Sequence, residues 1–295
     1  MIISQVPHTI LVLQNPDSLF FYHPNALIFD CSNQLYIMTF IRSEIEGNVL
    51  KITLNRPDKF NSFNREMALE LQTALDSGAH DKTIRAIYLT GEGKAFCAGQ
   101  DLSEAMDANG PGIERIVREH YNPIIERIRF IEKPVVCAVN GVAAGAGANI
   151  ALACDIVVAG SSVAFIQAFS KIGLIPDSGG TFFLPRLIGF GKASALMMLG
   201  DKVSAHDAEK MGMIYKVIDD TVLQTEAFVI AKTLSEMPTK AIGLTKKLLN
   251  QSMYNPMNMQ LEYEADMQVH ATTTYDYKEG VSAFLEKRKA NFKGE

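Results

Sequence analysis

Two glycine-rich segments have the composition of turns that expose main-chain N–H groups. Residues 95–102 read AFCAGQDL, and residues 140–149 read NGVAAGAGAN before a stretch with helical spacing. The small side chains of Ala98 and Gly99 allow a ligand to approach the backbone. The second segment places free N–H groups at the start of a helix, where the macrodipole favours negative charge. Together the two turns can form an oxyanion hole, although each alone is also typical of a tight structural turn.

A third segment adds a carboxylate to these donors. Residues 175–181 read IPDSGGT, so Asp177 lies after an apolar run and before two glycines. In an apolar pocket its pKa would rise toward the range that is useful for proton transfer. The same residue is also typical of a helix N-cap, here for a helix that starts near Gly179. We do not expect Ser178 to be a nucleophile, because the all-β pattern and disulfides of proteases with a DSGG string are absent from the sequence.

The rest of the sequence favours no nucleic-acid, metal or dinucleotide site. Its 295 residues include 28 Lys or Arg and 33 Asp or Glu, a net charge of −5, whereas nucleic-acid binding needs clustered basic residues. The four cysteines and six histidines lack the spacing of zinc ligands. Gly145 begins a GxGxxG pattern, but its third position is Ile150. No apolar run reaches the roughly 18 residues of a membrane span, so we expect a soluble, cytoplasmic protein with reduced thiols.

Apolar periodicity predicts the elements that position these segments. Strands are expected at 48–54, 86–90, 134–139 and 155–159. Asn64 can cap a helix over about 65–76, with the apolar residues of that helix on one face. The Gly/Ala segment between the last two strands predicts a β-α-β crossover with a crowded turn. Residues 205–290 are helical in pattern, and Tyr121 is typical of an ordinary helix face, with a place in a pocket as the alternative.

The predicted organisation is one α/β core followed by a helical module. Arg42 is the first Lys or Arg of the chain, and residues 1–37 carry no functional motif. Three explanations apply to this N-terminal extension: a start-site artefact with Met38 as the true start, which we favour, a disordered extension, or a small added strand pair. The core then covers residues 38–204, and the helical C-terminal module covers residues 205–295.

The order of the motifs resembles the crotonase superfamily of acyl-CoA hydratases and isomerases. AFCAGQDL is followed by KPVVCAVNGVAAGAGANIALACDIVVA and FSKIGLIPDSGGTFFLPRLIG, in the order and spacing of the family. The resemblance covers about residues 45–291, including DYKEGVSAFLEKRKANF near the C-terminus. It implies an α/β fold, a crotonase-like spiral of β-β-α units with a helical C-terminal trimerisation module. It also implies a homotrimer or hexamer with an acyl-CoA thioester as substrate.

The resemblance further implies roles for particular residues. The thioester oxygen would accept hydrogen bonds from the N–H groups of Ala98 and Ala146, and Asp177 would be the catalytic carboxylate. Substrate contacts are implied for Ala98, Gly99, Gln100, Asp101, Ala146, Asn149, Phe169 and Lys287. Lys287 and Arg288 would meet the CoA phosphates, with a solvated basic face as the alternative. No metal or dissociable cofactor is expected, because CoA is part of the substrate.

Departures from the hydratases of the family favour an isomerase. Hydratases carry two glutamates where this chain has Asn149 and Phe169, and water addition needs carboxylates to hold and deprotonate the water. A carboxylate at Asp177 is instead the arrangement of some family isomerases. The strings FCAGQDL, NGVAAGAGA and EGVSAFL most resemble the isomerases of ring-1,2-epoxyphenylacetyl-CoA in phenylacetate catabolism, which implies conversion of a ring epoxide to oxepin-CoA. Phe169 would then form an apolar wall beside an aromatic-derived acyl group.

Three alternatives stay open at this point. A Δ3,Δ2-enoyl-CoA isomerase of fatty-acid oxidation would use the same base and the same donors. An enoyl-CoA hydratase would have to work without the two glutamates. A non-catalytic acyl-CoA-binding protein would have no need for a carboxylate in the loop.

Overall fold

The computed structural model describes residues 27–29, 35–37 and 39–295. It divides the chain into one unit over Met1–Met38 and another over Thr39–Glu295. In the first unit, β1 (Leu27–Phe29) and β2 (Leu35–Ile37) form an antiparallel pair. Such a strand pair is one of the three explanations considered for the N-terminal extension. Most of that extension lies outside the described residues, so the position of the start codon stays a prediction.

The second unit contains two sheets. Its strands are β3 (Ile41–Glu46), β4 (Val49–Leu54), β5 (Ala86–Gly91), β6 (Ala95–Cys97), β7 (Val135–Val139), β8 (Val142–Ala144), β9 (Ile156–Gly160), β10 (Ala164–Ile166), β11 (Lys202–Ser204) and β12 (Lys216–Ile218). Within residues 39–295, the larger sheet has the strand order β12-β9-β7-β5-β4-β3 and the smaller has the order β11-β10-β8-β6. Neighbouring strands are parallel, except that β3 pairs antiparallel with β4 and β11 pairs antiparallel with β10.

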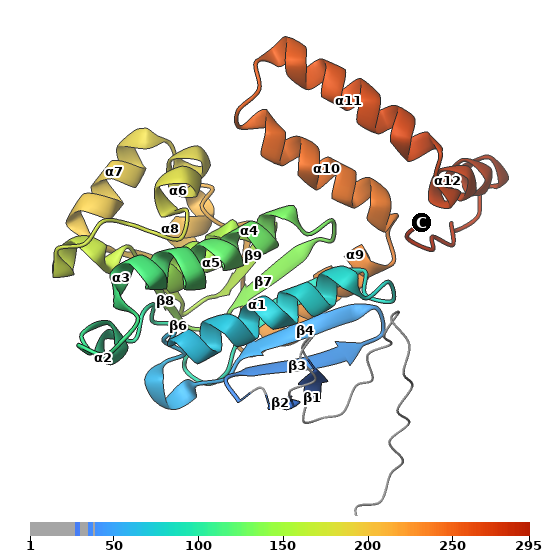
Figure 1. The fold of residues 1–295 in the computed structure, drawn as a ribbon. Helices are drawn as coiled ribbons and strands as arrows, with labels where there is room; N and C mark the ends of the chain where they lie inside the picture. The colour runs from blue at the N-terminus through green and yellow to red at the C-terminus, as the bar shows by residue number, and fades with distance from the viewer. Residues whose placement is uncertain (1–26, 30–34, 38) are drawn as a thin grey trace, which may run out of the picture. The chain divides into compact units, whose positions relative to one another are not determined.

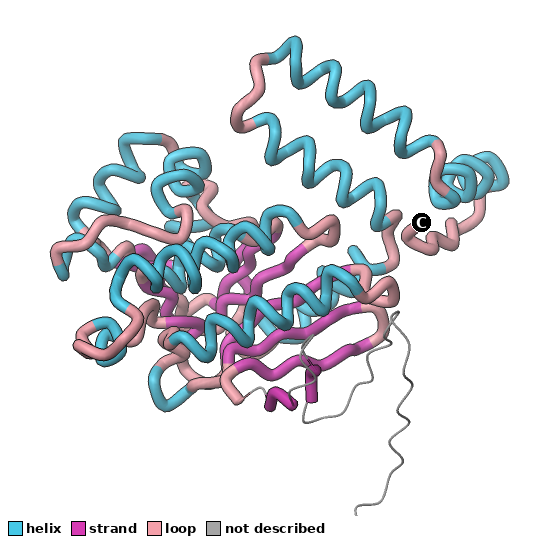
Figure 2. Tube along the Cα trace, in the orientation of Figure 1, coloured by secondary structure: helices cyan, strands magenta, loops and turns pink. Residues whose placement is uncertain are grey.

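Helices connect and cover these strands (Figure 1, Figure 2). They are α1 (Arg65–His80), α2 (Leu102–Ala105), α3 (Gly112–Arg115), α4 (Asn122–Phe130), α5 (Ala146–Ala153), α6 (Gly180–Ile188), α7 (Phe190–Leu199), α8 (Ala205–Lys210), α9 (Leu223–Ser235), α10 (Thr239–Ser252), α11 (Met257–Thr272) and α12 (Tyr275–Glu286). Short 3-10 turns lie at Pro57–Lys59 and Ala168–Ile172, and a π-helical turn, Ile116–Tyr121, leads into α4. Across the described part of the chain, no helix combines the length and apolarity that a membrane span requires.

The chain repeats a strand-strand-helix unit. β5, β7 and β9 lie in the larger sheet, and the strand that follows each of them, β6, β8 or β10, lies in the smaller sheet. The chain therefore turns a sharp corner between the two sheets in every repeat. At the corner before β8, a Cβ on Gly141 would lie only 2.2 Å from the carbonyl oxygen of Lys94, at the corner before β6. The two corners lie so close together that only glycine fits at position 141. This arrangement is the predicted spiral of β-β-α units.

The predicted cap of α1 is confirmed. The side chain of Asn64 accepts a hydrogen bond from the N–H of Met67 at 3.0 Å, and Met67, Leu71 and Leu75 are fully buried on one face of the helix. The helix ends at His80, four residues later than expected. Its last turns contain Gly78, which packs against Leu50 and Ile87. Tertiary packing therefore extends the helix beyond its apolar repeat.

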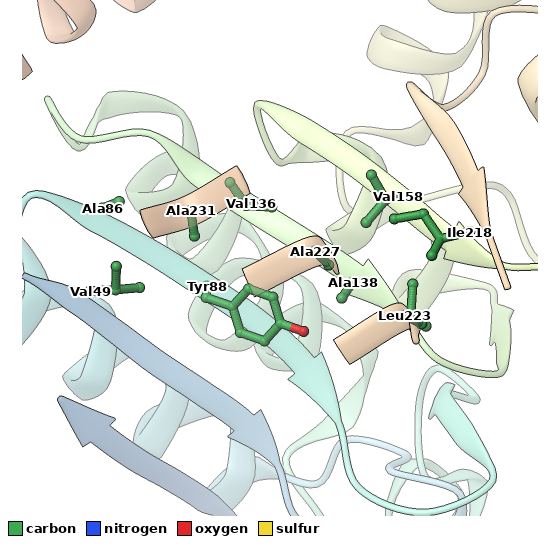
Figure 3. Close-up of a cluster of buried hydrophobic side chains, with 10 residues drawn as sticks. All are labelled: Val49, Ala86, Tyr88, Val136, Ala138, Val158, Ile218, Leu223, Ala227 and Ala231. Atoms are coloured by element: carbon green, nitrogen blue, oxygen red, sulfur yellow. The ribbon is translucent and has the colours of Figure 1, made fainter. Parts of the chain in front are cut away.

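One face of the larger sheet forms a core cluster with α9 (Figure 3). Alternate residues of the strands point to this face, among them Tyr88, Val136 and Val158. Ala227 and Ala231, one turn apart on α9, are small enough to let the helix lie close to the sheet. Because β12 and α9 complete this core, the segment predicted as helical over 205–295 contains one strand and one helix of the core.

The last three helices extend away from the sheets (Figure 1). α10 is tied to the core by Lys246, which is buried, pairs with Asp155 at 2.7 Å and donates to the carbonyl oxygen of Ile128. α11 has no buried residue, but the chain after α12 returns to the core, where Arg85 donates to the carbonyl oxygen of Phe292 at 2.8 Å. The helical C-terminal region predicted from the sequence is therefore present, and its outer part has exposed faces.

Candidate active site

The two donor turns lie side by side at one edge of the smaller sheet. β6 and β8 are parallel neighbours, so the turns that follow them meet at the same edge. Gly99 and Gly145 both have positive φ, +94° and +52°. A Cβ on Gly99 would lie 3.0 Å from the carbonyl oxygen of Ala144 and 3.5 Å from the nitrogen of Ala146. The main chains of the two turns are therefore in contact, as the oxyanion-hole hypothesis requires.

The first donor needs a correction, because the N–H of Ala98 is already used. It donates to the carbonyl oxygen of Phe60 at 3.0 Å. Phe63 bonds to the two residues on either side of Gln100: its N–H donates to Gly99 and its carbonyl accepts from Asp101. In an extended strand the N–H of Gln100 must then point away from Phe63. Among residues 39–295 this N–H has no acceptor, so Gln100 and not Ala98 presents the available donor.

The N–H of Ala146, the second predicted donor, lies at the start of α5. Ala146 is the first residue of α5, and in the described part of the chain its N–H has no hydrogen-bond acceptor. The preceding residue, Gly145, is held by a hydrogen bond from its own N–H to Ile166 at 2.9 Å. Gly147 packs so closely on β6 that a Cβ there would lie 2.5 Å from the carbonyl oxygen of Cys97. The start of α5 is therefore fixed against the end of β6, with its N–H free for a ligand.

Asp177 is bound to the same helix through its backbone. Its carbonyl oxygen accepts from the side-chain amide of Asn149, on α5, and from the N–H of Gly180, both at 2.9 Å. Its carboxylate accepts from the hydroxyl of Ser178 at 2.9 Å. Burial raises the pKa of this carboxyl, although the Ser178 hydroxyl opposes the shift. The N-cap of α6 is Gly179, so the alternative role of Asp177 as an N-cap is wrong and its carboxylate is not occupied by helix capping.

Asn149 and Phe169 have different places around this loop. Asn149 is fully buried, and its carbonyl Oδ1 accepts from Gln167 Nε2 at 2.8 Å while its amide holds Asp177. Both ends of the side chain are therefore used within the protein, and Asn149 positions the loop. Phe169 is also buried, with its ring 3.7 Å from where a Cβ of Gly145 would be. It forms an apolar wall beside the second donor turn.

Asp101 has a structural role in the first donor turn. Its carboxylate pairs with Arg56 at 2.8 Å and accepts from the N–H of Ser103 at the start of α2. Burial alone would raise the pKa of Asp101, but Arg56 and Ser103 outweigh it and leave the pKa below its ordinary value. Asp101 therefore stays ionised and holds the turn that carries Gln100.

Lys287 does not join this group of residues. It is exposed at the end of α12 with φ of +57°, and α12 is separated from α5 in Figure 1. Arg288 is paired with Glu279 and Glu286, both at 2.6 Å. A role of Lys287 toward the CoA phosphates stays a prediction, and Arg288 is engaged within its own helix end.

Two surface cavities of the described part lie elsewhere. One, of about 350 Å³, is lined by Lys192, Lys202, Val203, Asp207, Lys210 and Met211. The other, of about 270 Å³, is lined by residues of α10, of the end of α4 and of the turn that follows α4. None of the predicted site residues lines either cavity. The candidate site is thus defined by its main-chain donors and its carboxylate.

Sequence reasoning missed the importance of Tyr121. Its hydroxyl donates to Gln100 Oε1 at 2.8 Å, and its side chain is fully buried. Burial raises the pKa of Tyr121 well above its ordinary value, and the nearby acids Cys97, Asp177 and Glu104 add to the effect. Tyr121 is the last residue of the π-helical turn, and a local apolar repeat does not predict such a turn.

Comparisons with known proteins identify the family of this chain. The family described as enoyl-CoA hydratase/isomerase matches residues 44–295. The 1,2-epoxyphenylacetyl-CoA isomerase of Escherichia coli is 48% identical over 261 residues, which are 88% of this chain and 100% of that protein. The short-chain-enoyl-CoA hydratase of Clostridium acetobutylicum is 35% identical over 83% of this chain and 94% of its own length. A crystal structure of enoyl-CoA hydratase from Bacillus anthracis matches with a TM-score of 0.82 and 34% identity, covering 87% of this chain and 100% of that one. The predicted fold is confirmed by these likenesses.

Proposed function

The chain belongs to the enoyl-CoA hydratase/isomerase family, and we propose that it is an acyl-CoA isomerase that converts ring-1,2-epoxyphenylacetyl-CoA to oxepin-CoA in phenylacetate catabolism. One observation carries the proposal. The loop that carries the Asp177 carboxylate is hydrogen-bonded to α5, the helix of the second donor turn, whereas Asn149 and Phe169 occupy the positions where the resemblance places the hydratase glutamates. The name of the Escherichia coli relative supports the same substrate.

The proposed reaction moves one proton within the substrate. The N–H groups of Gln100 and Ala146 donate to the thioester oxygen, where negative charge develops when a proton leaves the neighbouring carbon. Asp177 takes this proton as its carboxylate and returns it from the carboxylic acid to the carbon two positions further along the conjugated system. The ring expands because the carbon–carbon bond shared by the epoxide and the six-membered ring breaks as the ring π bonds shift, which places the oxygen in a seven-membered ring. The proton transfer then moves the double bonds, the thioester carbonyl re-forms, and no atom is gained or lost. A raised pKa suits a carboxyl group that must first accept a proton and then donate it.

The surroundings of Asp177 favour rearrangement over water addition. Phe169 provides an apolar wall, and Asn149 has both ends of its side chain bonded within the protein. Water addition would need a second carboxylate to hold and deprotonate the water. We therefore propose isomerisation and not hydration as the main activity.

The experiment that tests this function uses two substrates. The epoxide is generated in situ and incubated with the purified protein, and the rearranged thioester is followed by mass and ultraviolet absorbance. We expect turnover on the order of 1–10³ s⁻¹ with the epoxide, and hydration of crotonyl-CoA slower by about 10²-fold or more. Fast hydration of crotonyl-CoA, or turnover of a Δ3-enoyl-CoA but not of the epoxide, would contradict the assignment.

The proposal includes a homotrimer or hexamer. The outer helices keep large apolar side chains in solvent: Met257 on α11 is 78% exposed, and Phe284 and Leu285 on α12 are 83% and 74% exposed. Monomeric proteins rarely leave apolar side chains of neighbouring helices uncovered in this way. We expect sedimentation equilibrium to give three or six times the chain mass, and a monomer at micromolar concentration would contradict this part of the proposal.

A further inference from the structure

The buried hydroxyl of Tyr121 is one of two clamps on the side chain of Gln100. Tyr121 donates to Gln100 Oε1 at 2.8 Å. At the other end of the same amide, Gln100 Nε2 donates to Glu104 Oε2 at 3.0 Å and lies 3.3 Å from the carbonyl oxygen of Asp101. The side chain is therefore held at both its oxygen and its nitrogen.

The partners fix the direction of each hydrogen bond. An ionised carboxylate only accepts, so Glu104 must face the NH2 group of Gln100. The amide oxygen must then face Tyr121, and the hydroxyl of Tyr121 must donate. Glu104 also accepts from the N–H of Arg65, the first residue of α1, at 2.9 Å. A chain of hydrogen bonds thus runs from Tyr121 to the Gln100 side chain, from there to Glu104, and from Glu104 to the start of α1.

The backbone around Tyr121 is arranged for this contact. Ile116–Tyr121 is a π-helical turn, a rare conformation that is frequent at functional sites. His120 and Tyr121 are adjacent in sequence, yet they are 1% and 0% exposed. The ring of Tyr121 packs edge-on against Phe63 at 5.9 Å between centroids. Phe63 is also the residue whose backbone bonds lie on both sides of Gln100, so ring and hydroxyl support the same short segment.

We propose that Tyr121 is a positioning residue, which fixes the peptide of Gln100 so that its N–H faces the thioester oxygen. The inference rests on the proposed function, because that function gives the Gln100 N–H its acceptor. Tyr121 acts through Gln100 and does not touch the substrate. A donor that is fixed before the reaction stabilises the developing charge without having to reorient when the charge forms.

The test compares Tyr121→Phe with a matched control. Tyr88 is also fully buried, and its hydroxyl donates to Gln224 at 2.7 Å in the core beside α9, so Tyr88→Phe loses the same kind of bond away from the site. We expect Tyr121→Phe to lower kcat about five- to tenfold with KM changed less than about twofold, and Tyr88→Phe to keep wild-type kcat. Glu104→Gln, which loses a carboxylate acceptor of the clamp, should lower kcat in the same way.

A spectroscopic readout separates positioning from catalysis. Bound cinnamoyl-CoA absorbs at longer wavelength when donors polarise its conjugated carbonyl, and no turnover is needed for this shift. We expect a smaller red shift in Tyr121→Phe than in wild type, and a wild-type shift in Tyr88→Phe and in Asp177→Asn. Equal shifts and equal kcat in Tyr121→Phe and wild type would overturn the inference, as would equal losses in both tyrosine variants. A red shift in wild type without epoxide turnover would overturn the proposed reaction. In that case the size of the red shift in Tyr121→Phe, compared with wild type, would still decide whether Tyr121 positions the Gln100 donor.

Discussion

An Asp177→Asn variant is expected to lose a factor of about 10² to 10⁴ in kcat with the epoxide substrate, with a small change in KM. Asparagine has nearly the same size, and its Oδ1 can still accept from the Ser178 hydroxyl. The backbone contacts of the loop to Asn149 and Gly180 are also unchanged. The variant lacks only the ability to take and return a proton, and initial rates on purified protein measure the loss.

The control for this variant is a second loop aspartate outside the site. Asp219 accepts from the N–H and the hydroxyl of Thr221 in a turn, so Asp219→Asn tests the same substitution without a role in proton transfer. We expect wild-type kcat for Asp219→Asn. If Asp177→Asn kept kcat within about threefold of wild type, the carboxylate would be removed from the mechanism.

The raised pKa of Asp177 predicts how both the stability and the activity of the protein depend on pH. Burial raises the pKa in the folded state, so the folded protein binds the proton more tightly than the unfolded chain does, and stability falls as pH rises from the ordinary pKa of 3.8 to the raised one. At pH 7 the ionised carboxylate is therefore unfavourable for folding, and Asp177→Asn should melt at the same or a higher temperature. The base must be ionised, so kcat/KM of wild type should rise with pH along an acidic limb that lies above pH 3.8, and the variant should lack this limb.

Local sequence patterns predict the long elements of the fold well. The cap at Asn64 and the apolar run of β7 are signals that lie within the elements themselves. The strands β6, β8 and β10 have three residues each, which is too short for a period-two pattern to show. They exist because the corners between the sheets bring them together, and this pairing is set by residues distant in sequence.

The same limit explains the errors at the site. Asp177 lies within one short motif, residues 175–181, so the sequence of that segment alone is enough to single it out. The choice between Ala98 and Gln100 depends on which N–H bonds to Phe60 and Phe63, residues more than thirty positions away. Buried polar contacts such as those of Glu70, whose carboxylate accepts from three N–H groups at Thr39, Phe40 and Ile41, are likewise invisible in a local pattern. A resemblance supplies the segment that carries a donor, but the hydrogen bonds of the fold decide which residue presents it.

Ala146→Pro is expected to lower kcat about 10²- to 10³-fold, because it removes the N–H that is proposed to hold the thioester oxygen. Proline is well tolerated at the first position of a helix, where the N–H has no partner within the helix and the backbone already has the required φ. The preceding residue, Gly145, has no Cβ to clash with the proline ring. The substitution therefore deletes one donor and leaves α5 in place, which a side-chain change cannot do.

The structure offers a matched control for this proline at the first residue of α7. Phe190 is 81% exposed and follows Gly189, which has a positive φ like Gly145, and among residues 39–295 its N–H has no acceptor. Phe190→Pro should leave kcat unchanged, and both variants should keep the free energy of unfolding within about 1 kcal/mol of wild type. If Ala146→Pro folded and kept both its kcat and the red shift of cinnamoyl-CoA, the Ala146 N–H would not be a donor to the thioester.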